Sequence, residues 1–186
     1  RLQGDWSSDV CSSDLLYIRE AFVNCFNIEQ IDIRYSNPEN SSTSPIWVNS
    51  AFQNCYNLSK LGATFSAPIA YHASGYGLNS TFYNCFKLPT IDMDLDTSTT
   101  SIYYNTFRNC ESLTSINFTL DGTSTIFQSS SYPTFAGCRN LSNVTTANFN
   151  RTSYILDFND TKMKKTEILN IISSLGTAVN ASQEID

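Results

Sequence analysis

Cysteines are the residues of this chain whose type and spacing most directly suggest chemistry. Five of the six recur at intervals of 30, 30, 25 and 28 residues: Cys25, Cys55, Cys85, Cys110 and Cys138. Zinc sites usually need paired ligands such as Cys-x-x-Cys, and the sequence has no such pair. A free cysteine packs as a small apolar group. We therefore expect a ladder of reduced, buried thiols, with disulfides between neighbouring copies as the alternative interpretation.

Two further groups of ionisable side chains could do chemistry. The single histidine, His72, lies in a loop without a recurring Asp, Ser or Cys partner, so we expect it to be structural or solvated. Asp92, Asp94 and Asp96 begin like a calcium-binding loop, but the glycine and the twelfth-position glutamate of such a loop are missing. Their alternation fits the outward face of a strand, and a weak surface calcium site is the alternative. The sequence therefore predicts no catalytic residue, no metal and no cofactor, and no enzyme.

The cysteines belong to a tandem repeat, Phe-x-Asn-Cys-x-x-Leu-x-x-Ile, which occurs five times. Each copy is apolar at the cysteine, three residues before it, and three and six residues after it. Four positions in one register across five copies indicate one repeated structural unit. A single unit cannot enclose its own apolar face, so the copies must stack. The expected core is Phe22, Cys25, Ile28, Ile31, Phe52, Cys55, Leu58, Leu61, Phe82, Cys85, Leu88, Ile91, Phe107, Cys110, Leu113, Ile116, Phe135, Cys138, Leu141 and Val144.

Beyond the last of these positions the apolar spacing becomes two. In the first copy Ile31, Ile33 and Tyr35 alternate with polar residues, and later copies repeat this alternation. Alternation over five or six residues predicts a half-buried strand. The outward positions of the stacked strands would form an extended polar surface. We take it as the candidate binding surface, made by Asp32, Arg34, Thr64, Asp92, Asp94, Asn117, Thr119 and Thr145.

An asparagine precedes the cysteine in four copies, and Gly137 takes its place in the fifth. Asparagine at a fixed turn can satisfy backbone groups of the adjacent coil or tolerate a left-handed backbone. We therefore expect a structural role, rather than ligand binding, for Asn24, Asn54, Asn84 and Asn109.

Both ends of the chain depart from the repeat. Residues 5–15, DWSSDVCSSDL, match the translation of a common sequencing adapter, so we expect residues 1–15 to be foreign to the protein. The solenoid of five copies would then occupy residues 16–149, in a metagenomic fragment of a longer chain. Residues 150–186 are expected to form a truncated cap, with a strand at 154–158 and a helix at 161–176 whose apolar face carries Ile168, Ile172 and Leu175.

Composition and charge exclude some classes of function. The 11 basic and 17 acidic residues give a net charge of −6; without residues 1–15 the counts are 10 and 14, a net charge of −4. An acidic chain without a basic stripe is not expected to bind nucleic acid. The sequence contains no run of 18 or more apolar residues, the length that would predict a membrane span. A surface rich in Ser, Thr and Asn is typical of secreted, cell-surface and virion proteins.

The motif F-x-N-C-x-x-L-x-x-I resembles the BspA-like class of bacterial leucine-rich repeat, from Leu16 to about Phe149. The resemblance implies a solenoid of short parallel strands and turns, although units of 25 to 30 residues exceed the regular repeat of that family. Similar proteins occur on bacterial surfaces, in parabasalid protists and in phage structural genes. We therefore expect a non-catalytic binding or adhesion module for a protein or glycan, at the cell surface or on a virion. A structural component of a phage tail, or a spacer stalk of a larger surface protein, is the alternative.

Overall fold

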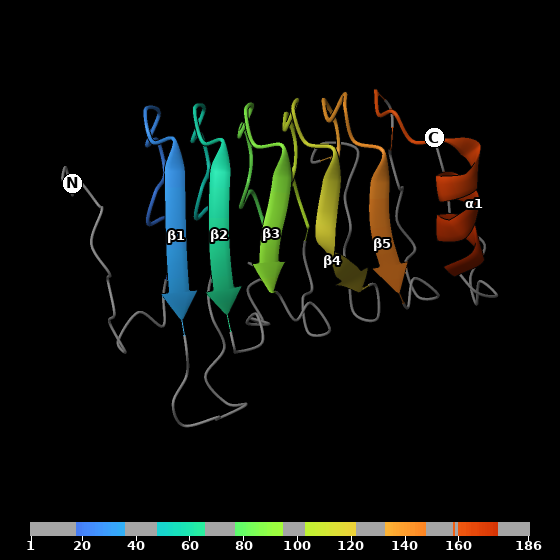
Figure 1. The fold of residues 1–186 in the computed structure, drawn as a ribbon, viewed down its shortest axis with the longest axis horizontal. Helices are drawn as coiled ribbons and strands as arrows, with labels where there is room; N and C mark the ends of the chain where they lie inside the picture. The colour runs from blue at the N-terminus through green and yellow to red at the C-terminus, as the bar shows by residue number, and fades with distance from the viewer. Residues whose placement is uncertain are drawn as a thin grey trace.

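The strands of this protein lie side by side in the order in which they occur in the sequence. A computed structural model describes residues 18–35, 48–65, 77–94, 103–121, 133–147, 158 and 160–174. All neighbouring strands pair in parallel, and a helix follows the last of them (Figure 1). The predicted solenoid of short parallel strands and turns, followed by a C-terminal helix, is confirmed. Its elements are β1 (Gln30–Tyr35), β2 (Lys60–Phe65), β3 (Thr90–Asp94), β4 (Ser115–Asp121), β5 (Asn143–Ala147) and α1 (Lys165–Ser174).

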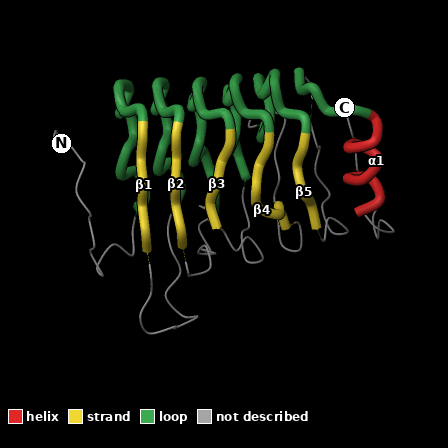
Figure 2. Tube along the Cα trace, viewed as in Figure 1, coloured by secondary structure: helices red, strands yellow, loops and turns green. Residues whose placement is uncertain are grey.

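Each strand and the loop before it form one coil of the solenoid, and the five coils are residues 18–35, 48–65, 77–94, 103–121 and 133–147. Each loop leads into the N-terminal end of its strand, and these ends all lie at the same end of the sheet (Figure 2). Backbone hydrogen bonds join the loops, since the Phe22 N–H donates to the Ala51 carbonyl and the Asn24 N–H to the Gln53 carbonyl, both at 2.9 Å. The same two bonds recur between every neighbouring pair of coils. The loops are therefore paired as regularly as the strands.

A stack of phenylalanine rings runs through the core. The rings of Phe22, Phe52, Phe82, Phe107 and Phe135 follow one another at 5.5–5.7 Å between centroids. Neighbouring planes differ by at most 14°, an offset-stacked arrangement that aromatic pairs favour. The other repeated apolar residues lie around this stack and are buried in the second to fifth coils. In the first coil, Phe22, Cys25 and Ile28 are only half-buried and pack against the core from its end.

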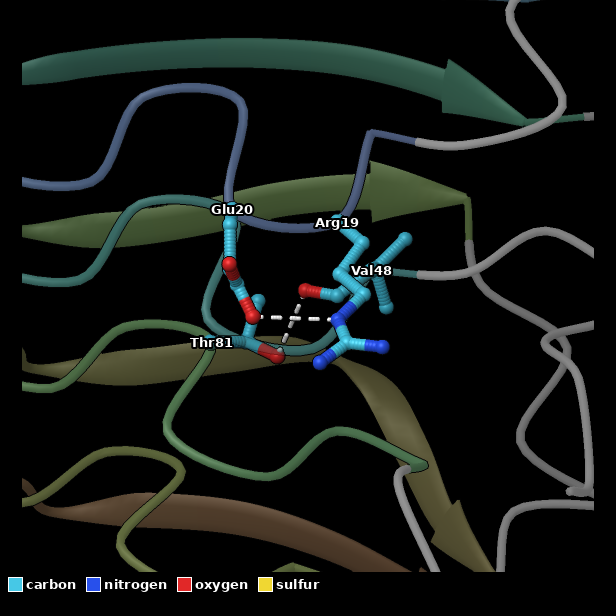
Figure 3. A network of polar contacts seen from close by, with 4 residues as sticks. All are labelled: Arg19, Glu20, Val48 and Thr81. Atoms are coloured by element: carbon cyan, nitrogen blue, oxygen red, sulfur yellow. Dashed lines mark hydrogen bonds and ion pairs between the residues drawn. The ribbon is translucent and has the colours of Figure 1, made fainter. Parts of the chain in front are cut away.

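A row of buried threonines also belongs to the core, at a position that the repeat motif did not include. The Thr81 hydroxyl donates to the Val48 carbonyl of the preceding coil at 3.0 Å (Figure 3). Thr106 and Thr134 make the equivalent bond, at 2.9 Å each. These bonds satisfy hydroxyl groups that would otherwise be costly to bury. The first two coils have alanine at this position, Ala21 and Ala51. Near Ala21, at the surface of the first coil, the Arg19 guanidinium forms an ion pair with the Glu20 carboxylate at 3.0 Å.

The sheet register departs once from the spacing of the repeat. Counting from the cysteines places Asn117 opposite Thr145, because both lie seven residues after a cysteine. In the structure Ser115 pairs with Asn143, whereas Thr119 pairs with Thr145. β4 therefore holds two extra residues between these pairs, in a bulge that the apolar pattern alone did not reveal.

The C-terminal segment covers the end of the fifth coil. The Phe158 ring stacks on Phe135 at 5.0 Å, and Ile171 of α1 is buried. The helix begins at Lys165, four residues later than predicted. It buries Ile171, while Leu169 and Ile172 are 48 % and 41 % exposed, so the predicted apolar face is rotated. Of the predicted strand at 154–158 only Phe158 is described, and Leu175 lies outside the described residues. Among the helices described, none has the length and apolar character needed to cross a membrane.

Candidate binding surface

Three of the eight polar side chains that the repeat pattern assigns to the outward face of the sheet are described in the structure. Asp32, Asn117 and Thr145 are exposed, while the residue before each of them is buried: Ile31, Ile116 and Val144. This alternation follows from the pleat, which directs successive side chains to opposite faces. The backbone of the remaining predicted surface residues lies in the strands, but their side chains fall outside the described set: Arg34, Thr64, Asp92, Asp94 and Thr119.

The register decides which of these positions are neighbours. Asp32, Gly62 and Asp92 lie in one line across the first three strands, and Arg34, Thr64 and Asp94 lie in the next. A Cβ atom on Gly62 would lie 3.3 Å from the Asp32 carboxylate, so this carboxylate leans over the second strand. Thr119 and Thr145 are neighbours across β4 and β5. By residue type, most of the predicted surface positions in β1 to β3 are charged, whereas the predicted positions in β4 and β5 (Asn117, Thr119 and Thr145) are uncharged.

Metal-ligating side chains do not gather in the described ranges. No three His, Cys, Asp or Glu side chains come together there in a way that could hold a metal ion. His72 and Asp96 lie outside the described residues. The described part of this face presents hydrogen-bonding groups and a carboxylate along a regular array of strands.

The five repeat cysteines are free thiols inside the solenoid. The thiols of Cys55, Cys85, Cys110 and Cys138 each donate to the phenylalanine carbonyl of the preceding coil, at 2.9–3.2 Å. Burial raises the pKa of Cys55 and Cys138 from 9.0 to about 12, and it holds the pKa of Cys85 and Cys110 well above the ordinary value. Because the nucleophile is the thiolate, burial that keeps these thiols protonated disfavours nucleophilic chemistry at them.

The asparagines before the cysteines form a second ladder, at the outer side of the loops. Asn24, Asn54, Asn84 and Asn109 all have a left-handed backbone, with φ of 62–63°. Each side-chain amide donates to the amide oxygen of the preceding one, at 2.7–2.8 Å. Gly137 continues the left-handed position in the fifth coil, at φ 78°, and ends the row of amides. The left-handed backbone was expected, but the hydrogen-bond partner is another side chain instead of the backbone.

A row of aromatic rings, which the repeat analysis did not single out, lies on the loops just after the cysteines. Phe26 is 45 % exposed, Tyr56 is 37 % exposed and Phe86 is half-buried. The Tyr56 ring lies 4.9 Å from that of Phe26 and 5.2 Å from that of Phe86, between centroids. The signal was in the sequence, because the residue after the cysteine is aromatic in three successive copies. In the fourth and fifth coils Glu111 and Arg139 take this position. We call Phe26, Tyr56 and Phe86 the aromatic row.

Comparison with known proteins gives one match. The family model of the BspA-type leucine-rich repeat region, of six copies, matches residues 78–185, more than half of the chain. The match includes the third, fourth and fifth coils and the C-terminal segment. The first two coils lie before it but share the same stacked rings and the same loop hydrogen bonds. No curated protein and no solved structure matches this chain.

Proposed function

Because the chain belongs to the BspA-type leucine-rich repeat family, we propose that it is a non-catalytic binding or adhesion module. The family is typically surface-associated, and we place the module outside the cell, where its sheet contacts a protein or a glycan. The outward face of the sheet is its contact surface, with Asp32, Asn117 and Thr145 as described members. The observation that carries this proposal is the exposure of these three polar side chains, each directly after a buried apolar residue of the core.

Several physical features support a binding role for this face. A stacked array of coils presents an extended surface whose shape is set by the core and not by the partner. The stacked phenylalanine rings and the two ladders of side-chain hydrogen bonds fix neighbouring coils against each other. A preformed surface loses little conformational entropy when it binds. The arrangement therefore suits recognition of a partner that is large enough to span several strands.

Arrays of extracellular-matrix proteins and of glycans, probed with the full chain, test this proposal. We expect at least one partner to bind well above background, and the triple substitution Asp32→Ala, Asn117→Ala and Thr145→Ala to weaken that binding. All three side chains are exposed, so the variant should keep its unfolding midpoint. Lys164→Ala with Lys165→Ala, which removes two exposed side chains where α1 begins, serves as the control. A chain that binds nothing on either array would instead favour a structural or spacer role.

A further inference from the structure

The aromatic row is a second surface, separate from the outward face of the sheet. It lies on the loops that precede β1, β2 and β3, and Figure 2 shows these loops in green leading into the strands. Phe26 and Tyr56 are two of only four large apolar side chains that are exposed within the described residues; the other two are on α1. The two rings adjoin one another, at 4.9 Å between centroids, so they form one continuous exposed aromatic surface.

The size of the row limits what it can bind. A full aromatic side chain buries about 150–250 Å². The exposed fractions of Phe26 and Tyr56, with the smaller part of Phe86, therefore offer on the order of 200 Å² of aromatic surface. A stable protein–protein interface needs roughly 800 Å² from each partner. The row is thus too small to be the centre of such an interface, but its three rings follow one another from coil to coil, as a site for a thin linear ligand requires.

The amide ladder is close to the row in the sequence. An asparagine of the ladder precedes each ring by two residues; the cysteine between them is buried in the second and third coils and half-buried in the first. An amide has two donor hydrogens and two acceptor lone pairs, and the ladder uses only one of each at Asn54 and Asn84. The second donor and the second lone pair of these amides remain for a ligand. A hydroxyl group, which both donates and accepts, matches this pair of functions.

The geometry repeats along the solenoid. Each of the first three coils supplies one ring and one amide, with the rings 4.9 and 5.2 Å apart. A ligand that uses all three coils must therefore repeat as well, with an apolar part and hydroxyl groups in every unit. The rings already lean on one another, so little side-chain entropy is lost when they are covered.

We propose that the aromatic row and the adjoining amide ladder bind an extended, uncharged polysaccharide that lies along the solenoid axis. The C–H surfaces of successive sugar rings pack on Phe26, Tyr56 and Phe86, and the sugar hydroxyls hydrogen-bond to Asn54 and Asn84. The site ends at the fourth coil, where the charged Glu111 replaces the ring. This inference deepens the proposed binding function by naming a ligand class, but it uses a different surface.

Native gel electrophoresis of the full chain, in gels that contain a soluble polysaccharide, tests the inference. The probes are hydroxyethyl cellulose, xylan, glucomannan and a β-1,3-glucan, with gels lacking polysaccharide as the reference. We expect retardation by at least one of these probes. Tyr56→Ala should weaken the apparent affinity by roughly tenfold, the effect of losing an aromatic contact worth about 1.4 kcal/mol. Tyr56→Phe keeps the ring and should retain the affinity.

Matched variants separate this site from the sheet face and from a folding defect. Phe26→Ser removes the most exposed ring of the row and should weaken retardation, with an unchanged unfolding midpoint by circular dichroism. Leu169→Ala removes a similarly exposed apolar side chain on α1 and should leave retardation unchanged. The triple substitution on the sheet face should also leave it unchanged. Mobility that no probe alters, or retardation that survives Tyr56→Ala and Phe26→Ser in folded protein, overturns the inference.

Discussion

At the scale of single residues, the asparagine that precedes four of the five repeat cysteines has two structural roles: it adopts a left-handed backbone, and its side chain hydrogen-bonds to a neighbouring coil. Few other side chains could combine these roles. The loop turns through a left-handed residue there, at φ 62–63°. Asparagine visits this region more easily than most residues because its short polar side chain can hydrogen-bond locally. The same side chain then bonds to its counterpart in the next coil at 2.7–2.8 Å. Glycine could supply the backbone conformation but not this bond, and Gly137 occupies the position where the row of amides ends.

Substitutions at Asn84 should separate the effect of the left-handed backbone from the effect of the side-chain hydrogen bonds. Asn84→Gly keeps the left-handed backbone without strain and loses two amide hydrogen bonds, at about 0.5–1.5 kcal/mol each. Asn84→Ala loses the same bonds and adds a left-handed strain of roughly 1–2 kcal/mol. We therefore expect the alanine variant to be the less stable one, although alanine is normally preferred to glycine in a folded chain. Urea unfolding of both variants measures the difference, and an alanine variant as stable as the glycine variant would contradict this account.

The buried thiols should make the stability of the protein sensitive to alkali. Burial raises the pKa of Cys55 and Cys138 from 9.0 to about 12, so the folded chain holds protons that the unfolded chain releases above pH 9. Their contribution to stability is fully present below pH 9 and is lost as the pH rises through about 12. The free energy of unfolding should fall by up to about 1.4 kcal/mol per pH unit for each such thiol.

Denaturant titrations between pH 8 and 11 test this dependence. Cys55→Ala should have a shallower decline than the natural sequence, because one of the ionising groups is gone. Cys25→Ala, at the half-buried end of the ladder, is the control and should change the slope less. Parallel curves for all three proteins would show that the thiols do not cause the alkaline loss.

At the scale of the elements, contacts with the neighbouring coils stabilise a coil of the solenoid more than contacts within the coil do. Its loop donates backbone hydrogen bonds to the next coil, and from the second coil onward its cysteine thiol donates to the coil before it. The helix α1 differs from the coils, because it contributes a side chain to the core beside β5. Ile171 is buried there, whereas Ile172, the next residue, is 41 % exposed.

Adjacent isoleucines on α1 therefore give a matched test of this packing. Ile171→Ala should cost about 2–5 kcal/mol, as truncations of buried isoleucine usually do. Ile172→Ala has the same helix propensity change but removes an exposed side chain, so its effect should stay within about 0.5 kcal/mol. Thermal unfolding of the two variants is the measurement. Equal losses would mean that the helix does not pack on the fifth coil as described.

At the scale of the whole molecule, the array is close to one-dimensional, since each coil contacts mainly the coils on either side. In such arrays stability is approximately a sum over coils and the interfaces between them. The ring of Phe82 stacks at 5.6 and 5.7 Å on two neighbours, whereas the half-buried Phe22 stacks on one described ring. A defect at the centre of the array should therefore matter more than the same defect at its end.

Phe82→Ala and Phe22→Ala compare the centre with the first coil. Truncation of a buried phenylalanine costs about 3–5 kcal/mol, and we expect Phe82→Ala to reach this range. Phe22→Ala should cost clearly less, and its unfolding should begin in the first coil. Hydrogen exchange of the loop amides locates the loss along the array. If the two variants lose equal stability, the stack does not act as a chain of neighbouring contacts.

Prediction from the sequence was most successful where a periodic pattern leaves only one physical solution. The residues at the cysteine, such as Cys85, and those three and six after it, such as Leu88 and Ile91, lie in the core, as their spacing indicated. The threonine row was missed, because Thr81 and its counterparts are polar by type and buried only through a bond to the neighbouring coil. The aromatic row was missed because the sequence does not show whether an apolar residue outside the repeated core positions is buried or exposed.

The sequence by itself determined the repeat, the parallel stacking and the alternation of polar and apolar residues, because one unit cannot bury its own apolar face. Tertiary structure alone decided which outward positions are neighbours, since the bulge in β4 aligns Thr119 rather than Asn117 with Thr145. It also decided that Ile171 and not Ile172 packs on the fifth coil. Both outcomes depend on how one element meets the next, and a pattern within a single element carries no information about that contact.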